Sequence, residues 1–299
     1  MRHTRHQRIF MAVFLAPAFF LFTAFVAVPG IRALLFSLRR WNGFTEPEWA
    51  GLDNFVWLFS RSELFLSALA HNAFLTVVPG ALILLLALSF AALLHRRIHG
   101  AAVFRVAFFF PNVIALVAIA LLWLLLYSAT EFGVINAALR QAERLFGADF
   151  GLPFPFLDSK YLMYSLVPMM VWTMTGFYMV LFLAAMEGIP ETFYEVAKLE
   201  GATGLQQFRH ITLPLIRDVV TVGAVFLLIT SLKFFDPIWV IENQRPTKDA
   251  HVLTTMLYQK VFSEYDVGRG SAVAVFLFVL VFCATLASLR LSRAERVEY

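Results

Sequence analysis

Long stretches without Asp, Glu, Lys or Arg dominate this chain and alternate with short polar segments. About 20 consecutive apolar residues cross the hydrocarbon core of a bilayer as a helix. One stretch is charge-free only over 219–232, but it is long enough if it begins at Leu213 and carries Arg217 and Asp218 at its edge. The pattern therefore predicts an all-α polytopic membrane protein with six transmembrane helices, at residues 9–31, 64–94, 106–130, 161–186, 213–232 and 271–289.

The first apolar stretch could also be a cleaved signal peptide, because Arg2, Arg5 and Arg8 precede it. Signal peptides have an apolar core of about 7 to 15 residues, followed by a small-x-small cleavage site. The stretch 9–31 is longer than that, and no such site follows it. An uncleaved first helix is the better interpretation. We therefore expect a single transmembrane domain over residues 1–299, with no soluble appendage.

Six helices place both termini on the same side of the membrane. If that side is the cytoplasm, the Lys and Arg residues divide equally between the two sides, so their number alone does not decide the orientation. The external segments would be longer in total, however, so basic residues are denser on the cytoplasmic side and flank helix ends, where the positive-inside rule applies. We expect cytoplasmic termini, with the basic flanks Arg2, Arg5, Arg8, Arg96, Arg97, Arg290, Arg293 and Arg296.

Composition supports a membrane protein and excludes several soluble classes. Hydrophobic residues make up 60% of the chain and charged residues only 15%, against about 25% charged in an average soluble domain. The net charge of +4 reflects membrane topology, because aromatic residues are not interleaved with a basic stripe as in nucleic-acid-binding surfaces. The single cysteine, Cys283, excludes an internal disulfide, and no Cys/His cluster has metal-ligand spacing. We expect contact with membrane lipid and no nucleic-acid partner.

The expected external segments are residues 32–63, 128–160 and 233–270. The second contains a predicted amphipathic helix from Val134 to Phe146, whose apolar side carries Ile135, Ala138, Leu139 and Leu145. Tryptophan is enriched at membrane interfaces. Anchoring there is the simplest interpretation of three tryptophans in the first segment, and contact with a partner is the alternative: Trp41, Trp49 and Trp57.

A polar loop, residues 187–212, separates the fourth and fifth apolar spans. Pro190 suits a first helical position, and Gly201 or Gly204 suits the end of a helix in the left-handed conformation. A second short helix over 205–211 would stop near Pro214. The predicted helical hairpin, in which Glu195 and Lys198 can pair, is either an ordinary interfacial connector or a face that another protein grips.

The spacing of this loop resembles a known family pattern. Glu195, Ala197 and Gly201 are followed, after nine residues, by Ile211-x-Leu213-Pro214. This resembles the cytoplasmic "EAA" loop of ATP-binding-cassette (ABC) importer permeases. The chain is similar to the carbohydrate-uptake type, the maltose and glycerol-phosphate permease group, also in segments that begin at Trp41-Asn-Gly, Gly51-Leu-Asp-Asn-Phe, Ser231-Leu-Lys-Phe-Phe-Asp-Pro and Val261-Phe-Ser-Glu-Tyr.

One departure from the pattern lies in the third external segment. Members of the group often have a Gly-Gly-Pro-type turn where this chain has Asn243-Gln-Arg-Pro. The shape of that loop is therefore open, and the difference could reflect a particular solute or binding protein.

The resemblance implies a subunit that transports a solute and performs no ATP chemistry. Its expected partners are two ABC ATPase subunits, a second permease in a heterodimer and a periplasmic or extracellular solute-binding protein, at a bacterial inner membrane. No glycine is followed by lysine, so the chain lacks a Walker A loop. The resemblance implies that this chain has no catalytic residue, metal or cofactor of its own and that the partner ATPase binds ATP–Mg. It assigns ATPase coupling to Tyr194, Glu195, Ala197, Gly201 and Ala202.

A sugar path through the membrane needs hydrogen-bonding and aromatic side chains at membrane depth. Polar groups there also join helices to one another, and for each single residue that structural role is the alternative. His71 is more simply a packing histidine than a proton relay, and Lys233 with Asp236 could form either an outer gate or a solvated pair. The path candidates are Asn72, Asn112, Trp172, Thr173, Thr175, Tyr178, Thr230 and Ser231.

Three other functions compete with a sugar permease. The same architecture could transport a non-sugar solute such as a polyamine, an amino acid or a phosphate ester. A secondary transporter would couple to an ion gradient, but few acidic residues lie well inside the spans. An integral membrane enzyme would need a convergent His/Asp/Cys set inside the bilayer, and the sequence offers none.

Overall fold

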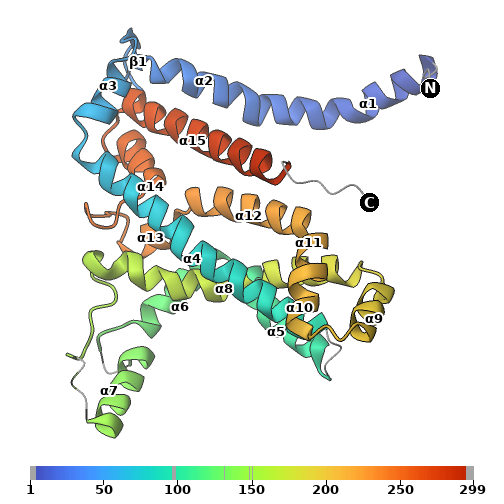
Figure 1. Ribbon diagram of the computed structural model, residues 1–299. Helices are drawn as coiled ribbons and strands as arrows, with labels where there is room; N and C mark the ends of the chain where they lie inside the picture. Colours follow the sequence, from blue (N-terminus) through green and yellow to red (C-terminus); the bar gives the residue numbers. More distant parts are fainter. Residues whose placement is uncertain (1–4, 96–98, 131, 148, 150, 294–299) are drawn as a thin grey trace. The chain divides into compact units, whose positions relative to one another are not determined.

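The computed structural model describes residues 5–95, 99–130, 132–147, 149 and 151–293. The chain divides into two compact units. Figure 1 labels their helices and strands. Unit 1 comprises Met1–Phe65 and Met256–Phe278, and unit 2 comprises Leu66–Thr255 and Val279–Tyr299. Several basic flanks from the orientation argument lie outside the described residues, namely Arg2, Arg96, Arg97 and Arg296 together with the side chains of Arg5, Arg8 and Arg293.

Unit 1 is built from helices and one small antiparallel sheet. α1 (Arg5–Phe22) passes through a π-helical segment (Thr23–Ala27) into α2 (Val28–Ser37). Strands β1 (Arg39–Arg40) and β2 (Glu48–Trp49) pair with each other, and α3 (Asp53–Ser60) follows. Three helices are shared with unit 2: α4 (Glu63–His95), α14 (Leu253–Tyr258), which continues into a π-helical segment at Gln259–Ser263, and α15 (Val267–Arg293).

The small sheet of unit 1 is fixed to the start of α15 by a close approach of two backbones. Gly268 donates its N–H to the Trp41 carbonyl at 3.2 Å. A Cβ added at Gly268 would lie 2.2 Å from the Arg39 carbonyl oxygen, so only glycine fits there. The Asn54 amide donates to the carbonyls of Ser37 and Arg39 at 2.9 and 2.8 Å. The segment that follows α2 is thus held by backbone and side-chain bonds together.

The regular secondary structure in the described residues of unit 2 is helical, with turns and loops between the helices. It contains most of α4 and, in chain order, α5 (Ala101–Val113), α6 (Leu116–Leu126), α7 (Val134–Phe146), α8 (Ser159–Glu187), α9 (Glu191–Leu199), α10 (Gly204–Gln207), a π-helical segment (Phe208–Thr212), α11 (Leu213–Leu215), α12 (Arg217–Leu232) and α13 (Asp236–Ile241). Its apolar core is rich in methionine, an unbranched residue that fills irregular spaces. The buried methionines on α8 are Met163, Met169, Met170, Met174, Met179 and Met186.

Five helices of the described chain are long and apolar enough to cross a membrane: Val13–Ser37, Glu63–His95, Ser159–Glu187, Arg217–Ile241 and Val267–Arg290. A sixth crossing requires α5 and α6 to count as one span, although they are bent by 98°. The polytopic all-α prediction agrees with this arrangement, but the third span differs from the continuous helix expected over 106–130. Ile114 and Ala115 adopt extended backbone with ψ of 138° and 133°, which ends α5 and starts α6 in a new direction.

α7 confirms the helix predicted from Val134 to Phe146. It has the same bounds and projects from the end of α6 in Figure 1. Its apolar side is only partly covered by protein. Ile135 and Leu139 are half-buried, whereas Ala138 and Leu145 are exposed. One edge of the helix therefore packs on unit 2, and the neighbouring edge does not.

α5 lies along α8 at a distance that only glycine permits. A Cβ added at Gly176 of α8 would lie 1.8 Å from the Phe108 carbonyl oxygen of α5. Small residues allow such contacts between membrane helices, where association gains little from the hydrophobic effect. Gly176 therefore sets the spacing of this helix pair.

We predict that Gly176→Ala lowers the thermal stability of the detergent-solubilised protein, because the added methyl group must push the two backbones apart. Overpacking of a well-packed core costs about 1 to 3 kcal/mol. The matched control is Gly30→Ala on α2, where an added Cβ meets nothing within 4 Å. Equal unfolding temperatures for the two variants would show that the close approach does not exist.

Candidate functional site

The polar loop between α8 and α12 folds into a helical hairpin, and Gly201 ends its first helix. Gly201 has φ +78°. Its N–H bonds to the Lys198 carbonyl at 3.0 Å, and the Ala202 N–H bonds to the Ala197 carbonyl at 2.9 Å. These two bonds are those of a Schellman motif, which satisfies the last carbonyls of a helix and places a left-handed residue just beyond it. Ala197, Gly201 and Ala202 thus share one structural role, the closure of α9.

The start of each hairpin helix differs slightly from the sequence expectation. Pro190 is the residue before α9, with ψ 134°, and not its first helical residue. Gly204 begins α10 and does not end α9. A capping box starts α10: the Thr203 N–H donates to Gln206 Oε1 at 2.7 Å, and the Gln206 N–H donates to Thr203 Oγ1 at 3.4 Å. The second helix then runs to Leu215, four residues beyond its predicted end.

Tyr194 points into the hairpin and braces it. Its hydroxyl lies 2.9 Å from Thr212 Oγ1, and its ring centre lies 5.7 Å from that of His95 at the end of α4. Gln207 adds a bond from its side-chain amide to the Ala202 carbonyl at 3.0 Å. The two helices and the end of α4 are thereby held together. Tyr194 is a brace inside the hairpin and not part of its outer surface.

The outer face of the hairpin carries one carboxylate and several uncovered apolar side chains. Glu195 is exposed, and the ion pair with Lys198 that the spacing allowed is not formed in the described residues. Leu199 is 88% exposed and Leu205 is 76% exposed. Val196 is exposed as well. Sequence reasoning missed these three aliphatic residues, although apolar residues in a polar loop are themselves a signal for a contact surface.

A cavity of about 950 Å³ lies beneath the hairpin, between the ends of α4 and α8 and the start of α5. Arg105 of α5 and Glu187 of α8 form an ion pair on its wall, with Nη2 2.6 Å from Oε1. Both side chains are about half exposed, and such pairs contribute only about 0–1 kcal/mol. The ion pair therefore positions α5 against α8 and adds little to the stability of the fold. The hairpin thus follows α8 directly in the chain and contacts α4 through Tyr194, and the cavity separates the rest of it from these helices.

Two polar residues of α4 bind backbone groups of unit 2. The Asn72 amide donates to the Leu232 carbonyl at 3.2 Å and accepts from the Leu253 N–H at 2.7 Å. His71 Nδ1 lies 2.7 Å from the His251 carbonyl, which confirms that it is a packing histidine with a bonding partner. Asn72 is fully buried, and its bonds favour the structural role that was left open for it.

The hydroxyl candidates on α8 and α12 mostly bond within their own helices. Thr173 and Thr175 donate to the carbonyls of Met169 and Val171 at 2.7 and 2.6 Å, and Thr230 donates to Phe226 at 2.9 Å. Two further candidates are buried: Tyr178, and Ser231, whose hydroxyl has no bonding partner in the described chain. These residues pack inside unit 2 and do not reach an open surface, except for the half-buried Thr230.

An aromatic stripe follows one open side of α8. Trp172 is 43% exposed and contacts Trp123 of α6 at 6.3 Å between ring centres. Tyr164 and Pro168 are exposed at the positions eight and four residues before it, so the three share one helix side. Tyr164 was not among the sequence candidates, although its spacing to Trp172 was visible. Asn112 is also exposed, near the bend that follows α5.

The two outer-gate candidates do not meet in the described structure. Lys233 is exposed and Asp236 is half-buried at the start of α13, and no ion pair joins them. The nearby turn explains the departure at Asn243. Asn243 and Gln244 have φ of +50° and +63°, a left-handed backbone that a Gly-Gly turn adopts readily. The turn therefore keeps a glycine-like backbone without glycine.

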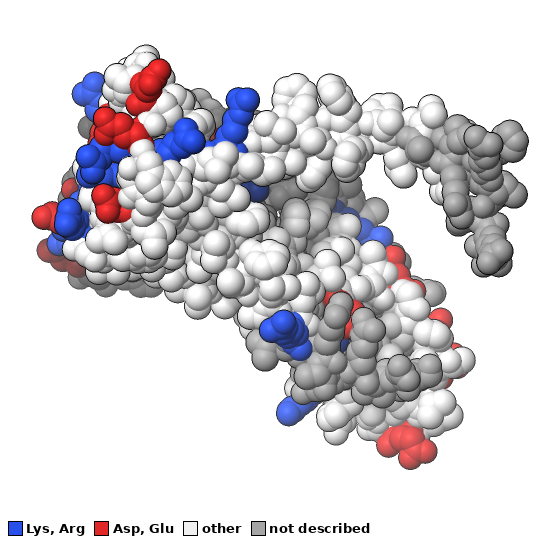
Figure 2. Space-filling view, turned by 90° about the horizontal axis from the view of Figure 1, so that it is seen from above, with Lys and Arg blue, Asp and Glu red and all other residues white. Residues whose placement is uncertain are grey.

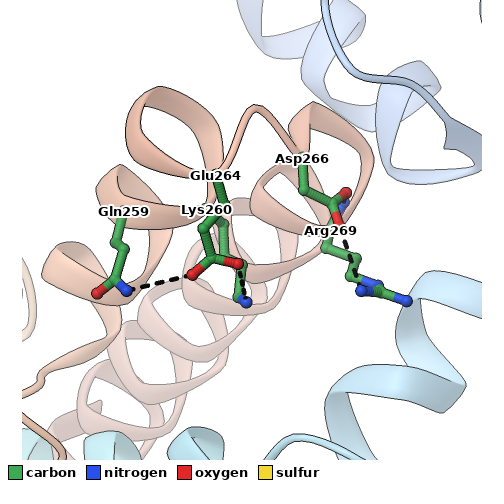
Figure 3. A network of polar contacts seen from close by, with 5 residues as sticks. All are labelled: Gln259, Lys260, Glu264, Asp266 and Arg269. Atoms are coloured by element: carbon green, nitrogen blue, oxygen red, sulfur yellow. Dashed lines mark hydrogen bonds and ion pairs between the residues drawn. The ribbon is translucent and has the colours of Figure 1, made fainter.

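Unit 1 has its own polar cluster, made of Gln259, Lys260, Glu264, Asp266 and Arg269 (Figure 3). Trp57 lies next to it. Lys260 Nζ and Arg269 Cζ lie 5.1 and 4.7 Å from the Trp57 ring centre, within the range of cation–π attraction. Glu264 holds Lys260, and Asp266 holds Arg269 at 3.3 Å. The Trp57 ring is thus held between two cations that are themselves paired with carboxylates.

A second cavity, of about 530 Å³, borders this cluster. Figure 2 shows acidic and basic side chains crowded at the end of unit 1 where β1 and α3 lie. Tyr265 has φ +53°, a strained backbone for an aromatic residue, and its exposed ring lies 5.4 Å from that of Phe44. Exposed aromatic residues within a charged rim are typical of protein contact surfaces.

Comparison with known proteins gives one family over most of the chain. Residues 84–297 match the family described as "binding-protein-dependent transport system inner membrane component". The diacetylchitobiose uptake system permease protein NgcF of Streptomyces coelicolor is 31% identical over 92% of this chain and 80% of its own. The trehalose/maltose transport system permease protein MalF of Thermococcus litoralis is 30% identical, over 91% of this chain and 90% of its own.

A solved structure shares both the fold and part of the sequence. A chain of a bacterial ABC transporter that imports the acidic polysaccharide alginate superimposes with a TM-score of 0.78 at 25% identity. The match covers 96% of this chain and 96% of that one. The likeness therefore extends over both units of the present chain.

We predict that Gly201→Ala loosens the hairpin, because alanine in the left-handed region costs about 1 to 2 kcal/mol. Hydrogen exchange followed by mass spectrometry should show faster exchange over residues 191–215. Gly204→Ala is the matched control, since Gly204 already has helical backbone. Unchanged exchange in Gly201→Ala would contradict the role of Gly201 as the closing residue.

Proposed function

This chain belongs to the family of binding-protein-dependent transport system inner membrane components, and we propose that it is the permease subunit of an ABC importer for a sugar or sugar-like solute. The relatives described above are named for diacetylchitobiose, trehalose/maltose and alginate, and this supports the saccharide class. The observation that carries the mechanism is the braced hairpin at the end of α8, with its uncovered apolar face.

We propose that the hairpin docks on an ABC ATPase subunit, which binds ATP–Mg. The exposed Leu199, Val196 and Leu205 would enter a groove of that subunit, and the exposed Glu195 would pair with a basic group at its edge. Fully desolvated apolar anchors dominate the energy of such contacts. The hairpin, residues 187–212, would then lie in the cytoplasm together with both termini, within one permease domain over 1–299.

Force from the ATPase would reach the membrane through the brace. Tyr194 bonds to Thr212 and contacts His95, so displacement of α9 moves the ends of α4 and α12 with it. Ile216, with φ −93° and ψ 5°, interrupts the helix between α11 and α12 and gives a place for the angle to change. The chain performs no hydrolysis in this scheme, because the nucleotide site lies on the partner.

The translocation path would follow the aromatic stripe of α8. Aromatic faces and hydrogen-bonding groups suit a sugar, and Tyr164, Trp172 and Asn112 are the open side chains that offer them in unit 2. A second permease subunit would close the other side of the path. A solute-binding protein would dock on the external segments, where the unit 1 cluster next to Trp57 and the exposed Phe44 and Tyr265 provide a contact surface. A ligand drives such a cycle only through different affinities for the two states.

We predict that Leu199→Glu abolishes solute-stimulated ATP hydrolysis by the reconstituted importer, because a buried charge would replace an apolar anchor. Co-purification of the ATPase subunit should fall at least about tenfold, which corresponds to a loss of roughly 1.4 kcal/mol. The matched control is Glu200→Gln, an exposed neighbour at the end of α9. Full stimulated activity in Leu199→Glu would refute the docking role.

Trp172→Ala is expected to slow solute uptake while leaving ATPase assembly intact, because the open indole face in the path would be lost. Uptake of labelled maltodextrin, trehalose and chitobiose by proteoliposomes measures this effect. Val222→Ala, an exposed apolar position on α12, serves as the control. If uptake is equal in both variants, the path does not follow the α8 stripe, and uptake of none of these saccharides would count against the sugar class.

A further inference from the structure

α7 carries an apolar surface that the functions assigned so far do not use. Phe146 is 80% exposed and Leu145 is 71% exposed, and Val134 and Ala138 are open as well. At 3.6 residues per turn, Val134, Ala138 and Leu145 lie on one helix edge. Arg140 and Arg144 lie on a different, polar side. The helix is therefore amphipathic, and a large part of its apolar side is uncovered in this chain.

The position of α7 relative to α8 is fixed by one buried side chain. Asn136 is fully buried, and its amide donates to the carbonyls of Ser128 and Phe154 at 3.1 and 3.2 Å. Its oxygen accepts the Phe154 N–H at 2.9 Å. Phe154 also contacts Tyr161 in the first turn of α8, at 5.0 Å between ring centres. The first turn of α7 is thus tied to the N-terminal end of α8.

That end of α8 would lie at a membrane surface, because the candidate span Ser159–Glu187 is long and apolar enough to cross a bilayer. α8 has 29 residues, so it is about 43 Å long, and the hydrocarbon core of a bilayer is about 30 Å thick. The hairpin lies at its other end. In Figure 1 the axis of α7 runs across the direction of α8 and not along it. A helix in this position would lie in the plane of the membrane.

We propose that α7 is an interfacial helix that lies on the outer leaflet and inserts Val134, Leu145 and Phe146 among the lipids. Ile135 and Leu139 pack on unit 2 from the adjoining edge, so the apolar surface passes without a break from protein core to open helix. Interfacial helices bury such a face about 5–10 Å into the boundary between headgroups and acyl chains. The guanidinium groups of Arg140 and Arg144 would bind lipid phosphates from the polar side.

A bilayer explains the pattern better than a protein partner. The uncovered face carries Val134, Ala138, Leu145 and Phe146 beside a single polar residue, Gln141, and the cations Arg140 and Arg144 lie to one side, as on membrane-surface helices. Leu121, Leu122 and Leu125 at the end of α6 are exposed too, so the open apolar surface continues onto the helix that precedes α7. α7 would rest on lipid whichever solute the protein carries.

Site-directed fluorescence on the full chain tests this placement. Cys283→Ser removes the single native thiol, and Leu145→Cys or Ala137→Cys then accepts an environment-sensitive dye. Ala137 is exposed and shares the polar side with Arg140 and Arg144, which makes it the matched control. The proteins are placed in nanodiscs of phosphatidylethanolamine and phosphatidylglycerol, with part of the lipid carrying a nitroxide near the top of its acyl chain.

We expect the dye at position 145 to emit at shorter wavelength and to be quenched about threefold more than the dye at position 137, because only the apolar edge enters the lipid. Phe146→Cys provides the same measurement if Leu145→Cys does not yield monodisperse protein. Equal quenching at 145 and 137, or none at either, overturns the proposal. Shielding of position 145 only after addition of a binding protein or a second permease overturns it as well, because the face would then be a protein contact.

Discussion

In a bilayer, every backbone N–H and C=O must find a partner within the protein, since no water is present to replace it. This constraint governs the places where the helices of this chain stop. Asn72 supplies bonds to Leu232 and Leu253, in the last turn of α12 and at the start of α14. Asn136 does the same for Ser128 and Phe154 on either side of α7. Buried side-chain amides thus bond to backbone groups at and near the ends of helices. These bonds hold the non-helical segments in place.

The same constraint separates what the sequence predicts from what it does not. The hairpin was predictable because Pro190, Gly201 and the polar run around them follow local rules of helix ends. The bend between α5 and α6 was predictable only in part: Pro111 and Asn112 lie just before it, and proline can kink a helix, but Ile114 and Ala115 at the bend are apolar and are not helix breakers. The contact of α5 with α8 at Gly176, which joins segments far apart in the sequence, was not predictable from local rules.

The choice of path residues shows a similar limit. Polar residue type suggested Asn72, Thr173 and Thr175, yet their polar atoms bond to nearby backbone. In a helix that is apolar almost throughout, residue type does not show which side faces protein. Tyr164 and Trp172 stand out only when their exposure is known. The helical hairpin was predicted well because its contacts are local, whereas the exposure of the side chains on α8 depends on distant segments and could not be predicted.

The Asn72 amide has a mechanical consequence. One side chain bonds to Leu232 and Leu253 at once. It therefore links three segments that are far apart in the sequence: α4, the end of α12 and the start of α14. If the proposed coupling displaces the start of α12, sliding of its last turn or of the start of α14 past α4 would break a buried bond. The three segments would then move together, and a small change of angle at Ile216 would become a larger displacement at the far end of α12.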